Sequence, residues 1–255
     1  MIHPTSVINK DASIDSDVII GPYCTIDGKV IIKKGTRLIS HVVIQGTTEI
    51  GENCTISPFV SIGGPPQDIT YKGEDTRVVI GDNNNIKEYV TINRGTVHGG
   101  GITSVGNNNF LMAYAHIAHD CKVANNVIMA NCATLGGHIE VADFVILSGL
   151  CAIHQFCRIG KYAFVSGLTG VPKDIPPFII AAGNRARPYG LNVVGLERRG
   201  FSKEEISKLK KAYRILFRSA VPLSTALKII QEELDGENIR ELIDFIQASK
   251  RGICR

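Results

Sequence analysis

The sequence predicts an all-β solenoid of short parallel strands followed by a small α-helical tail. Three features of the 255 residues support this prediction. An apolar residue recurs at every sixth position through most of the chain up to residue 190, the fifth place of the same hexads is usually small or β-branched, and after residue 190 the apolar spacing becomes helical. We therefore expect a solenoid over residues 1–190 and a C-terminal α-helical domain over residues 191–255.

The hexad repeat determines the geometry expected of the solenoid. Its apolar positions fall in three uninterrupted runs, over residues 8–62, 80–92 and 105–171. Two inward residues in every six, one large and one small, fit neither a helix nor a single amphipathic strand. They fit a flat-sided coil in which each hexad makes one strand and one corner, so that three hexads complete a turn. We expect Gly, Asn and Asp at the corners, because these residues tolerate positive φ.

The hexad pattern is interrupted twice, and both interruptions predict loops that leave the solenoid. Residues 63–78 contain two prolines and lose the hexad chemistry, while the spacing from Ile62 to Ile80 indicates that the three-hexad phase is kept. Residues 94–104 contain a Gly-Gly-Gly triplet, which we expect to be flexible, and the spacing across this loop indicates one added residue. Loops on a rigid scaffold often carry function.

The tail carries helix start signals. Ser202 and Glu205 have the spacing of a capping box, and the apolar residues that follow at helical intervals predict a helix to about Arg218. A second helix is expected over residues 224–234 and a third from about Asn238.

Composition excludes several classes of function. The net charge is only +4 and no run of five Lys or Arg occurs, so nucleic acid is not expected as a main partner. No apolar stretch is long enough to predict an integral membrane segment, and the N-terminus has no signal-peptide pattern. Seven cysteines without a Cys-x-x-Cys pair indicate a reduced, cytoplasmic chain, and five are expected as core filler: Cys24, Cys54, Cys121, Cys151 and Cys157.

Histidine and glycine spacing places a candidate base and a candidate backbone donor in one column. A reaction that removes a hydroxyl proton needs a base, and one that develops an oxyanion needs a donor for it. Histidine suits the first task because its ordinary pKa is about 6.5. His119, Gly137 and Gln155 are spaced by three hexads, so we expect them in one column on successive turns, about 5 Å apart. A glycine in that column would let a carbonyl approach the backbone closely.

Five segments, residues 67–68, 115–121, 133–138, 152–157 and 195–201, resemble those of the acyl-[acyl-carrier-protein]–UDP-N-acetylglucosamine O-acyltransferase family of hexapeptide-repeat proteins. The resemblance implies a left-handed parallel β-helix with a C-terminal helical domain, assembled as a homotrimer. It implies transfer of a 3-hydroxyacyl chain from acyl carrier protein to the glucosamine 3-OH of UDP-N-acetylglucosamine, the first step of lipid A biosynthesis. It also implies no metal and no cofactor, the phosphopantetheine being carried by the acyl carrier protein.

The same resemblance implies the catalytic roles. His119 is implied as the general base, Asp120 as the residue that orients it, and the Gly137 N–H as the oxyanion donor. The implied substrate-binding residues include His154 near the acyl donor and a set at the nucleotide-sugar. These other substrate-binding residues are Gln67, Asp68, His116, His138, Gln155, Asn192 and Arg198.

The size of the acyl chain and the docking of its carrier are also expectations. Gly167 matches the position that limits chain length in the family, and a small residue there leaves room for a chain of about twelve to fourteen carbons or more. Acyl carrier proteins are acidic, so the basic face of the helical tail is expected either to dock them or to be merely solvated. Its residues are Lys203, Lys208, Lys210, Lys211, Arg214 and Arg218.

Three positions depart from the family pattern, in which Thr70 is commonly Lys, Asn93 is often His and Val194 is often Glu. The departures leave open whether the acceptor is a 3-hydroxyl or a 3-amino sugar. Because of them, the resemblance implies the nucleotide-sugar contacts less firmly than it implies His119 as the base.

Three other functions remain open at this stage. The later N-acyltransferase of the same pathway usually has an extra N-terminal domain, whereas here the repeat begins by residue 8. A γ-type carbonic anhydrase shares the solenoid but binds zinc through three histidines. An inert structural solenoid needs no column of His119, Gly137 and Gln155. His3, His41 and His98 are expected to be surface or otherwise satisfied residues.

Overall fold

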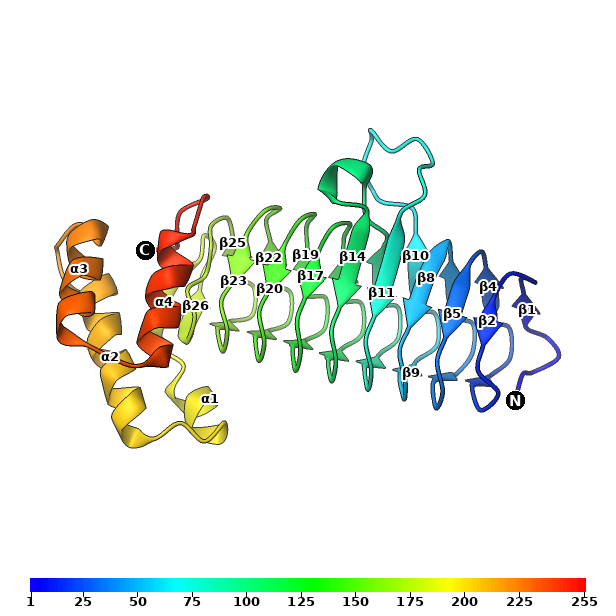
Figure 1. The fold of residues 1–255 in the computed structure, drawn as a ribbon, viewed down its shortest axis with the longest axis horizontal. Coiled ribbons are helices and arrows are strands. Elements are labelled where there is room, and N and C mark those ends of the chain that lie inside the picture. The colour runs from blue at the N-terminus through cyan, green and yellow to red at the C-terminus, as the bar shows by residue number, and fades with distance from the viewer.

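The structure, a computed structural model that describes all 255 residues, is a long three-sided β-helix (Figure 1). Each turn of the chain adds one strand to each of three sheets, and four helices cap the C-terminal end. Sheet 1 contains β1 (Val7–Ile8), β4 (Thr25–Asp27), β7 (Val43–Gln45), β10 (Ser61–Gly64), β13 (Thr91–Asn93), β16 (His116–Ile117), β19 (Thr134–Leu135), β22 (Ala152–Ile153) and β25 (Gly170–Val171).

The two other sheets are built in the same way. Sheet 2 contains β2 (Ser13–Ile14), β5 (Val30–Ile32), β8 (Thr47–Ile50), β11 (Arg77–Ile80), β14 (Ile102–Val105), β17 (Lys122–Val123), β20 (Glu140–Val141) and β23 (Arg158–Ile159). Sheet 3 contains β3 (Ile19–Ile20), β6 (Arg37–Leu38), β9 (Thr55–Ile56), β12 (Asn85–Ile86), β15 (Phe110–Leu111), β18 (Ile128–Met129), β21 (Ile146–Leu147), β24 (Phe164–Val165), β26 (Ile179–Ala182) and β27 (Arg187–Leu191).

Strand pairing confirms the predicted turn of three hexads. In sheet 1, His116 pairs with Thr134 and Thr134 with Ala152, and in sheet 2 Val123 pairs with Val141, all in parallel register. The uniform step places side chains that are three hexads apart in the sequence directly above one another. A column predicted from sequence spacing is therefore a real column in this part of the molecule.

Both predictions about the interruptions are wrong in their lengths. Ile62 pairs with Ile92 and Ile92 pairs with Ile117, so the first loop inserts two whole hexads into its turn and the second inserts seven residues. Ile62 and Ile80 lie on adjacent sheets rather than one turn apart. An insertion of two hexads preserves the sequence phase without adding a turn, which is why spacing alone misled the prediction.

The hexad aliphatics form one continuous core. Ile20, Ile26, Ile32 and their equivalents on later turns are buried in a single cluster of 46 buried residues. Each buried Ile, Leu or Val contributes about 1.5–3 kcal/mol, but only because a neighbouring turn covers it. The five predicted filler cysteines are buried there, and burial raises the pKa of Cys121 to about 12 and that of Cys151 and Cys157 to about 11. These thiols are core residues and not nucleophiles, as predicted.

One corner of the β-helix differs from the expectation of small polar residues. Where sheet 3 passes to sheet 1, the left-handed backbone positions hold Tyr23, His41, Phe59, Tyr89 and Tyr114, with φ between 52° and 64°. Successive ring centroids are 4.8–5.0 Å apart, with the first pair tilted and the pairs from His41 to Tyr114 stacked. Stacking, at about 0.5–1.5 kcal/mol per pair, offsets the cost of the left-handed backbone. Asn does occupy the corner between sheets 2 and 3, at positions 53, 83, 108 and 126.

The tail contains α1 (Val193–Arg198), α2 (Lys203–Phe217), α3 (Leu223–Glu233) and α4 (Glu237–Gln247). The capping box of Ser202 and Glu205 is present, and α2, α3 and α4 begin and end within one residue of the predicted positions where these were given. The sequence analysis missed α1 and the antiparallel pairing of β26 with β27. This hairpin ends sheet 3, and a second core of 13 buried residues joins the helices to it through Phe178.

Candidate active site

Both loops leave the β-helix at the corner between sheet 1 and sheet 2, which we call the 1–2 corner. The first loop lies between β10 and β11, and the second, with a 3₁₀ turn at Val97–Gly99, lies between β13 and β14 (Figure 1). His119 and Asp120 occupy the same corner on the next turn, between β16 and β17. The loops and the predicted catalytic pair are therefore neighbours in space.

His119 is oriented by Asp120. Its Nδ1 lies 2.8 Å from Asp120 Oδ2, and because the Asp120 side chain is fully buried, this contact is shielded from water. A carboxylate can only accept, so Nδ1 carries the proton and Nε2 keeps a free lone pair in the neutral ring. The His119 side chain remains 11% exposed. The pair thus has the form of a general base and its orienting acid.

Gly137 lies against the His119 ring, as the column prediction required. A Cβ added at Gly137 would be 2.5 Å from His119 Cε1 and 2.8 Å from Nε2, so only glycine fits. The Gly137 N–H donates no hydrogen bond within the chain, whereas the next residue, His138, donates its N–H to the His119 carbonyl at 3.0 Å. An unengaged amide beside the free imidazole nitrogen can donate to a ligand oxygen.

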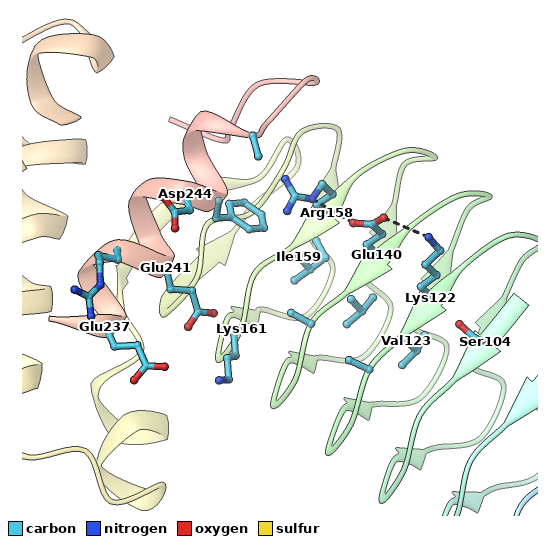
Figure 2. A pocket seen from close by; sticks show the side chains of 16 residues that line it. Ser104, Lys122, Val123, Glu140, Arg158, Ile159, Lys161, Glu237, Glu241 and Asp244 are labelled. Carbon is cyan, nitrogen blue, oxygen red and sulfur yellow. Dashed lines mark ion pairs between the residues drawn. The ribbon is translucent and has the colours of Figure 1, made fainter. Parts of the chain in front are cut away.

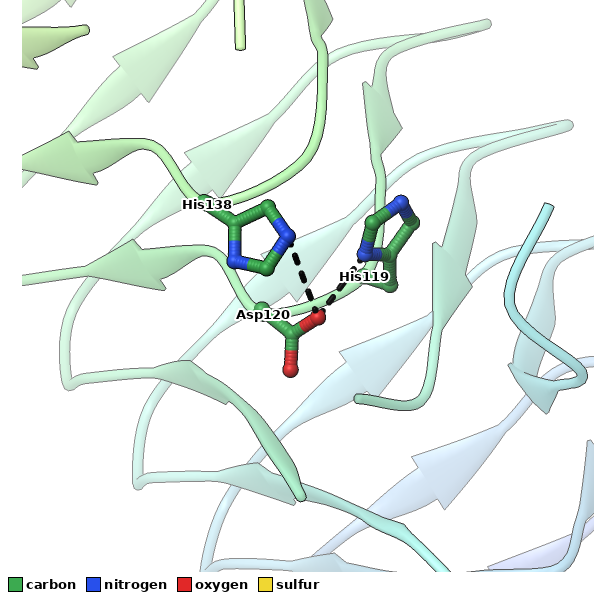
Figure 3. A group of neighbouring side chains, drawn as sticks. All are labelled: His119, Asp120 and His138. Atoms are coloured by element: carbon green, nitrogen blue, oxygen red, sulfur yellow. Dashed lines mark hydrogen bonds and ion pairs between the residues drawn. The ribbon is translucent and has the colours of Figure 1, made fainter. Parts of the chain in front are cut away.

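His138 forms the wall beside this pair (Figure 3). Its ring meets that of His119 edge-on, with centroids 5.1 Å apart, and stacks on Phe156 at 4.4 Å. His138 Nε2 lies 3.7 Å from Asp120 Oδ2. Desolvation lowers the pKa of His138, so the ring is neutral near pH 7 and offers one N–H donor and one acceptor.

The same three side chains are the one group in the chain with the spacing of a metal site. Ligand atoms of His119, Asp120 and His138 all lie within 4.8 Å of one another. However, Asp120 Oδ2 already accepts hydrogen bonds from His119 and from Thr96 Oγ1, at 2.8 and 2.6 Å. A cation would have to displace both donors, so the arrangement fits a hydrogen-bonded pair better than a metal centre.

The two loops meet over the site through Asp68 and His98. His98 Nε2 lies 3.3 Å from Asp68 Oδ2, and its ring centroid is 5.8 Å from that of His138. Asp68 also accepts bonds from the Thr70 N–H and hydroxyl, at 2.8 and 2.7 Å, and these bonds lower its pKa. Asp68 is thus ionised at the rim of the site. The His98 side chain is 57% exposed and is paired with Asp68, which agrees with the expectation of a surface or otherwise satisfied residue.

The remaining predicted residues of the 1–2 corner and sheet 1 surround this centre. His116 lies on the outer face of sheet 1, with Nδ1 2.7 Å from Thr91 Oγ1, and burial lowers its pKa. His154 Nδ1 accepts from Arg251 at 2.8 Å two turns further along. Gln155 is exposed in the column above Gly137, and Gln67 is exposed on the first loop.

Three predicted residues lie elsewhere. Asn192 caps α1, accepting the Gly195 N–H at 3.2 Å, and donates to the Tyr162 carbonyl at the corner between sheets 2 and 3. Arg198 ends α1, and its neighbour Arg199 lies over the ring of Phe144 at that same corner, with the guanidinium carbon 4.7 Å from the ring centroid. Gly167 lies at the corner between sheets 3 and 1, where an added Cβ would be 3.2 Å from the Gly149 carbonyl. One chain therefore does not bring these three to His119.

Two of the three family departures also have structural roles here. The Asn93 side-chain amide donates to the Pro65 carbonyl at 2.8 Å and so fixes the start of the first loop. The Asn93 Oδ1 is buried and has no hydrogen-bond partner. Thr70, as above, fixes Asp68. Val194 is exposed on α1.

The basic face of α2 is partly neutralised. Lys208 pairs with Asp235 at 2.6 Å and with Glu204 at 3.4 Å, and Lys211 pairs with Glu233 at 2.7 Å. Lys203, Lys210, Arg214 and Arg218 form no ion pair with an acidic side chain, so they are the members of the predicted face that keep an unpaired charge for a docking protein.

A hollow of about 1030 Å³ adjoins this site without including it, because Lys122 and Glu140 line it but His119, Asp120 and His138 do not. It lies between α4 and the outer face of sheet 2 (Figure 2), and no histidine lines it. Lys122 and Arg158 both pair with Glu140 across its floor, and burial raises the pKa of Glu241 on its α4 wall. Acidic and basic side chains are balanced there. We therefore assign the site by geometry at the 1–2 corner and not by cavity size.

No helix is both long and apolar enough to cross a membrane. This agrees with the absence of a long apolar stretch in the sequence.

Comparison with known proteins gives consistent results. A family model described as Udp N-acetylglucosamine O-acyltransferase, domain 2, matches residues 174–254, and a bacterial transferase hexapeptide model matches residues 102–137. The chain is 61% identical to the acyl-[acyl-carrier-protein]–UDP-N-acetylglucosamine O-acyltransferase of Thermodesulfovibrio yellowstonii, covering 100% of this chain and 99% of that one. It is 49% identical, with the same coverage, to the protein of that name from Syntrophobacter fumaroxidans.

Solved structures give the same result. The UDP-N-acetylglucosamine acyltransferase of Bacteroides fragilis superposes with a TM-score of 0.98 at 42% identity, covering 100% of both chains. The Arabidopsis UDP-N-acetylglucosamine acyltransferase superposes with a TM-score of 0.87 at 32% identity, again covering 100% of both chains. The three parallel sheets are thus those of the left-handed parallel β-helix that the resemblance implied.

Proposed function

The chain belongs to the acyl-[acyl-carrier-protein]–UDP-N-acetylglucosamine O-acyltransferase family, and from this premise we propose that His119 is the general base of its reaction. The enzyme transfers an acyl chain from acyl carrier protein to UDP-N-acetylglucosamine, the first step of lipid A biosynthesis. The observation that carries the proposed mechanism is the position of His119, whose Nδ1 is bonded to Asp120 while its Nε2 faces Gly137.

The first half of the reaction forms the ester bond. His119 Nε2 takes the proton of the sugar 3-hydroxyl as the hydroxyl oxygen attacks the thioester carbonyl carbon. The carbonyl π pair moves onto oxygen, and the Gly137 N–H donates to this oxyanion. Asp120 stabilises the imidazolium that results, because its carboxylate is buried and 2.8 Å from Nδ1.

The second half releases the carrier. The oxyanion collapses, the C–S bond breaks, and the imidazolium returns its proton from Nε2 to the departing pantetheine sulfur. No metal or further cofactor is needed, because every proton is exchanged between His119 and the two substrates. Asp68, His116, His138 and Gln155 surround the acceptor in this proposal, and Gly167 leaves room for a chain of about twelve to fourteen carbons or more.

We propose a homotrimer because the implied site is divided between corners. Asn192 and Arg198 lie at the corner between sheets 2 and 3, so a second copy is needed to bring Arg198 to His119. The outer face of sheet 3 carries a half-buried apolar ladder, which suits a partner subunit: Phe110, Ile128, Ile146, Phe164 and Ile180. The outer face of sheet 2, by contrast, carries the charged Lys122, Glu140 and Arg158.

The shared site makes a testable prediction about mixed oligomers. His119→Ala and Arg198→Ala are each expected to be nearly inactive alone. Co-expressed at equal levels, they are expected to recover about one quarter of the wild-type sites, because random mixing pairs an intact His119 with an intact Arg198 at that frequency. Sedimentation of the wild type tests the trimer directly. Mixed variants that stay as inactive as the separate ones would place both residues of a site in one chain.

A product assay tests the function itself. Purified protein is mixed with UDP-N-acetylglucosamine and 3-hydroxyacyl carrier proteins of several lengths, and the products are identified by mass. We expect an O-acylated product, with no loss of rate after treatment with a chelator. A zinc-dependent hydration activity, as in a γ-type carbonic anhydrase, or transfer only to an amino sugar would contradict this expectation.

A further inference from the structure

We propose that Thr96 is a positioning residue for catalysis, because it holds the Asp120 carboxylate in the orientation that His119 needs. The inference rests on the proposed role of His119 as base. Thr96 lies on the second loop, and sequence analysis did not single it out. Its side chain forms hydrogen bonds to Asp120 and Gly99 and none to His119 or to a residue assigned to substrate, so it acts through Asp120.

Thr96 supplies two of the three hydrogen bonds to the Asp120 carboxylate. Its N–H donates to Oδ1 at 2.8 Å and its hydroxyl donates to Oδ2 at 2.6 Å, while His119 Nδ1 is the third donor. This carboxylate is fully buried, and its only ion-pair partners are the two histidines, with no Lys or Arg beside it. A buried carboxylate without a Lys or Arg partner depends on such donors to remain ionised.

The loop is constructed around this contact. Thr96 begins the 3₁₀ turn, and its Oγ1 also accepts the Gly99 N–H at 3.2 Å. A Cβ at Gly99 would be 2.1 Å from Asp120 Cγ, so glycine lets the turn close directly over the carboxylate. The glycine triplet lies in a loop, as expected, and at Gly99 the absence of a side chain is what permits this contact. The seven inserted residues give the chain enough length to cover Asp120.

The Thr96 hydroxyl also decides between two histidines. His119 Nδ1 is 2.8 Å from Asp120 Oδ2, and His138 Nε2 is 3.7 Å from the same oxygen. If the Asp120 carboxylate rotated, Oδ2 would move closer to His138 Nε2. His119 would then lose the contact that fixes its tautomer. With the hydroxyl bonded to Oδ2 and the N–H bonded to Oδ1, both oxygens are fixed and this rotation is prevented.

Two threonines that touch Asp120 in different ways provide a matched test. Thr96→Val keeps the shape and the backbone donor but removes the hydroxyl, and Thr96→Ser retains the hydroxyl. Thr103→Val is the control, because Thr103 is equally buried but its Oγ1 accepts the Asp120 backbone N–H at 2.8 Å and does not touch the carboxylate.

We expect Thr96→Val to lower kcat by roughly 10- to 100-fold, with KM for both substrates within about twofold of wild type. Its kcat–pH profile should also differ from that of the wild type, because the carboxylate that orients the base is no longer held in one position. Thr96→Ser should restore most of kcat and the wild-type profile. Thr103→Val should change thermal stability but not the pH profile.

Other results would overturn the inference. If Thr96→Val retains kcat within twofold, or if Thr96→Ser is as slow as Thr96→Val, the hydroxyl does not position the carboxylate. If Thr103→Val shifts the pH profile equally, the effect is one of local packing. Failure of the base proposal is a separate result, since it would appear as a His119→Ala variant with full rate, whatever the Thr96 variants do.

Discussion

Replacing His119 with Ala is expected to lower kcat by about 10³-fold or more while the protein stays folded. A positioned general base contributes roughly 10²–10⁴-fold, and this ring also returns the proton to the leaving sulfur. Some stability should be lost because Asp120 loses one of its three donors, but the protein should stay folded because the ring lies at the corner outside the aliphatic core. Steady-state rates with an acyl carrier protein donor, together with a thermal melt, measure both effects.

The matched control is His3→Ala, which removes an exposed histidine near the N-terminal end of the β-helix. It should have the wild-type rate and pH profile. A His119→Ala protein that retains the full rate would mean that another group takes the hydroxyl proton, or that the solenoid has only a structural role.

Gly137→Ala is expected to be the second most damaging change at the site. The new Cβ would lie 2.5 Å from His119 Cε1, so the ring must move away from both the oxyanion donor and the acceptor hydroxyl. A displacement of about 1 Å at a reacting group can cost roughly 10²-fold in rate. We therefore expect kcat to fall by about two orders of magnitude and the melting temperature to change by only a few degrees.

Gly190→Ala is the control for this substitution. Nothing lies within 4 Å of a Cβ at Gly190, and its backbone is outside the left-handed region, so an added methyl should be tolerated. If Gly137→Ala were as active as Gly190→Ala, the contact between Gly137 and the imidazole would have no catalytic importance. A crystal structure of the Gly137→Ala variant would show whether the His119 ring has moved.

Much of the fold and part of the site were predictable from residue spacing. The three-hexad turn follows from a repeat that every turn must obey, because each strand needs a neighbour at the same register to bury its aliphatic residue. That periodicity placed Gly137 one turn from His119 and Gln155 two turns away. The capping box at Ser202 was equally readable, since it is a local hydrogen-bond pattern.

The loops were not predictable in the same way. Sequence spacing across an insertion does not say how many residues leave the repeat, so both lengths were misjudged, and the contact of His98 with Asp68 over the site gave no signal. Thr96 gave no signal, because its importance depends on a contact with a residue 24 positions away in the chain. The aromatic ladder that includes Tyr89 and Tyr114 was also missed, since stacking between turns overrides the local preference for small corner residues.

The sequence by itself determined the β-helix, its turn length and the stacking of the imidazole on glycine, because a strict repeat converts distance along the chain directly into distance in space. Only the tertiary structure decided how Asp120 is held, how the two loops meet over the base, and that Arg198 lies on a different corner from His119. These features depend on segments that leave the repeat, and the position of such segments is fixed by packing and hydrogen bonds between residues far apart in the chain.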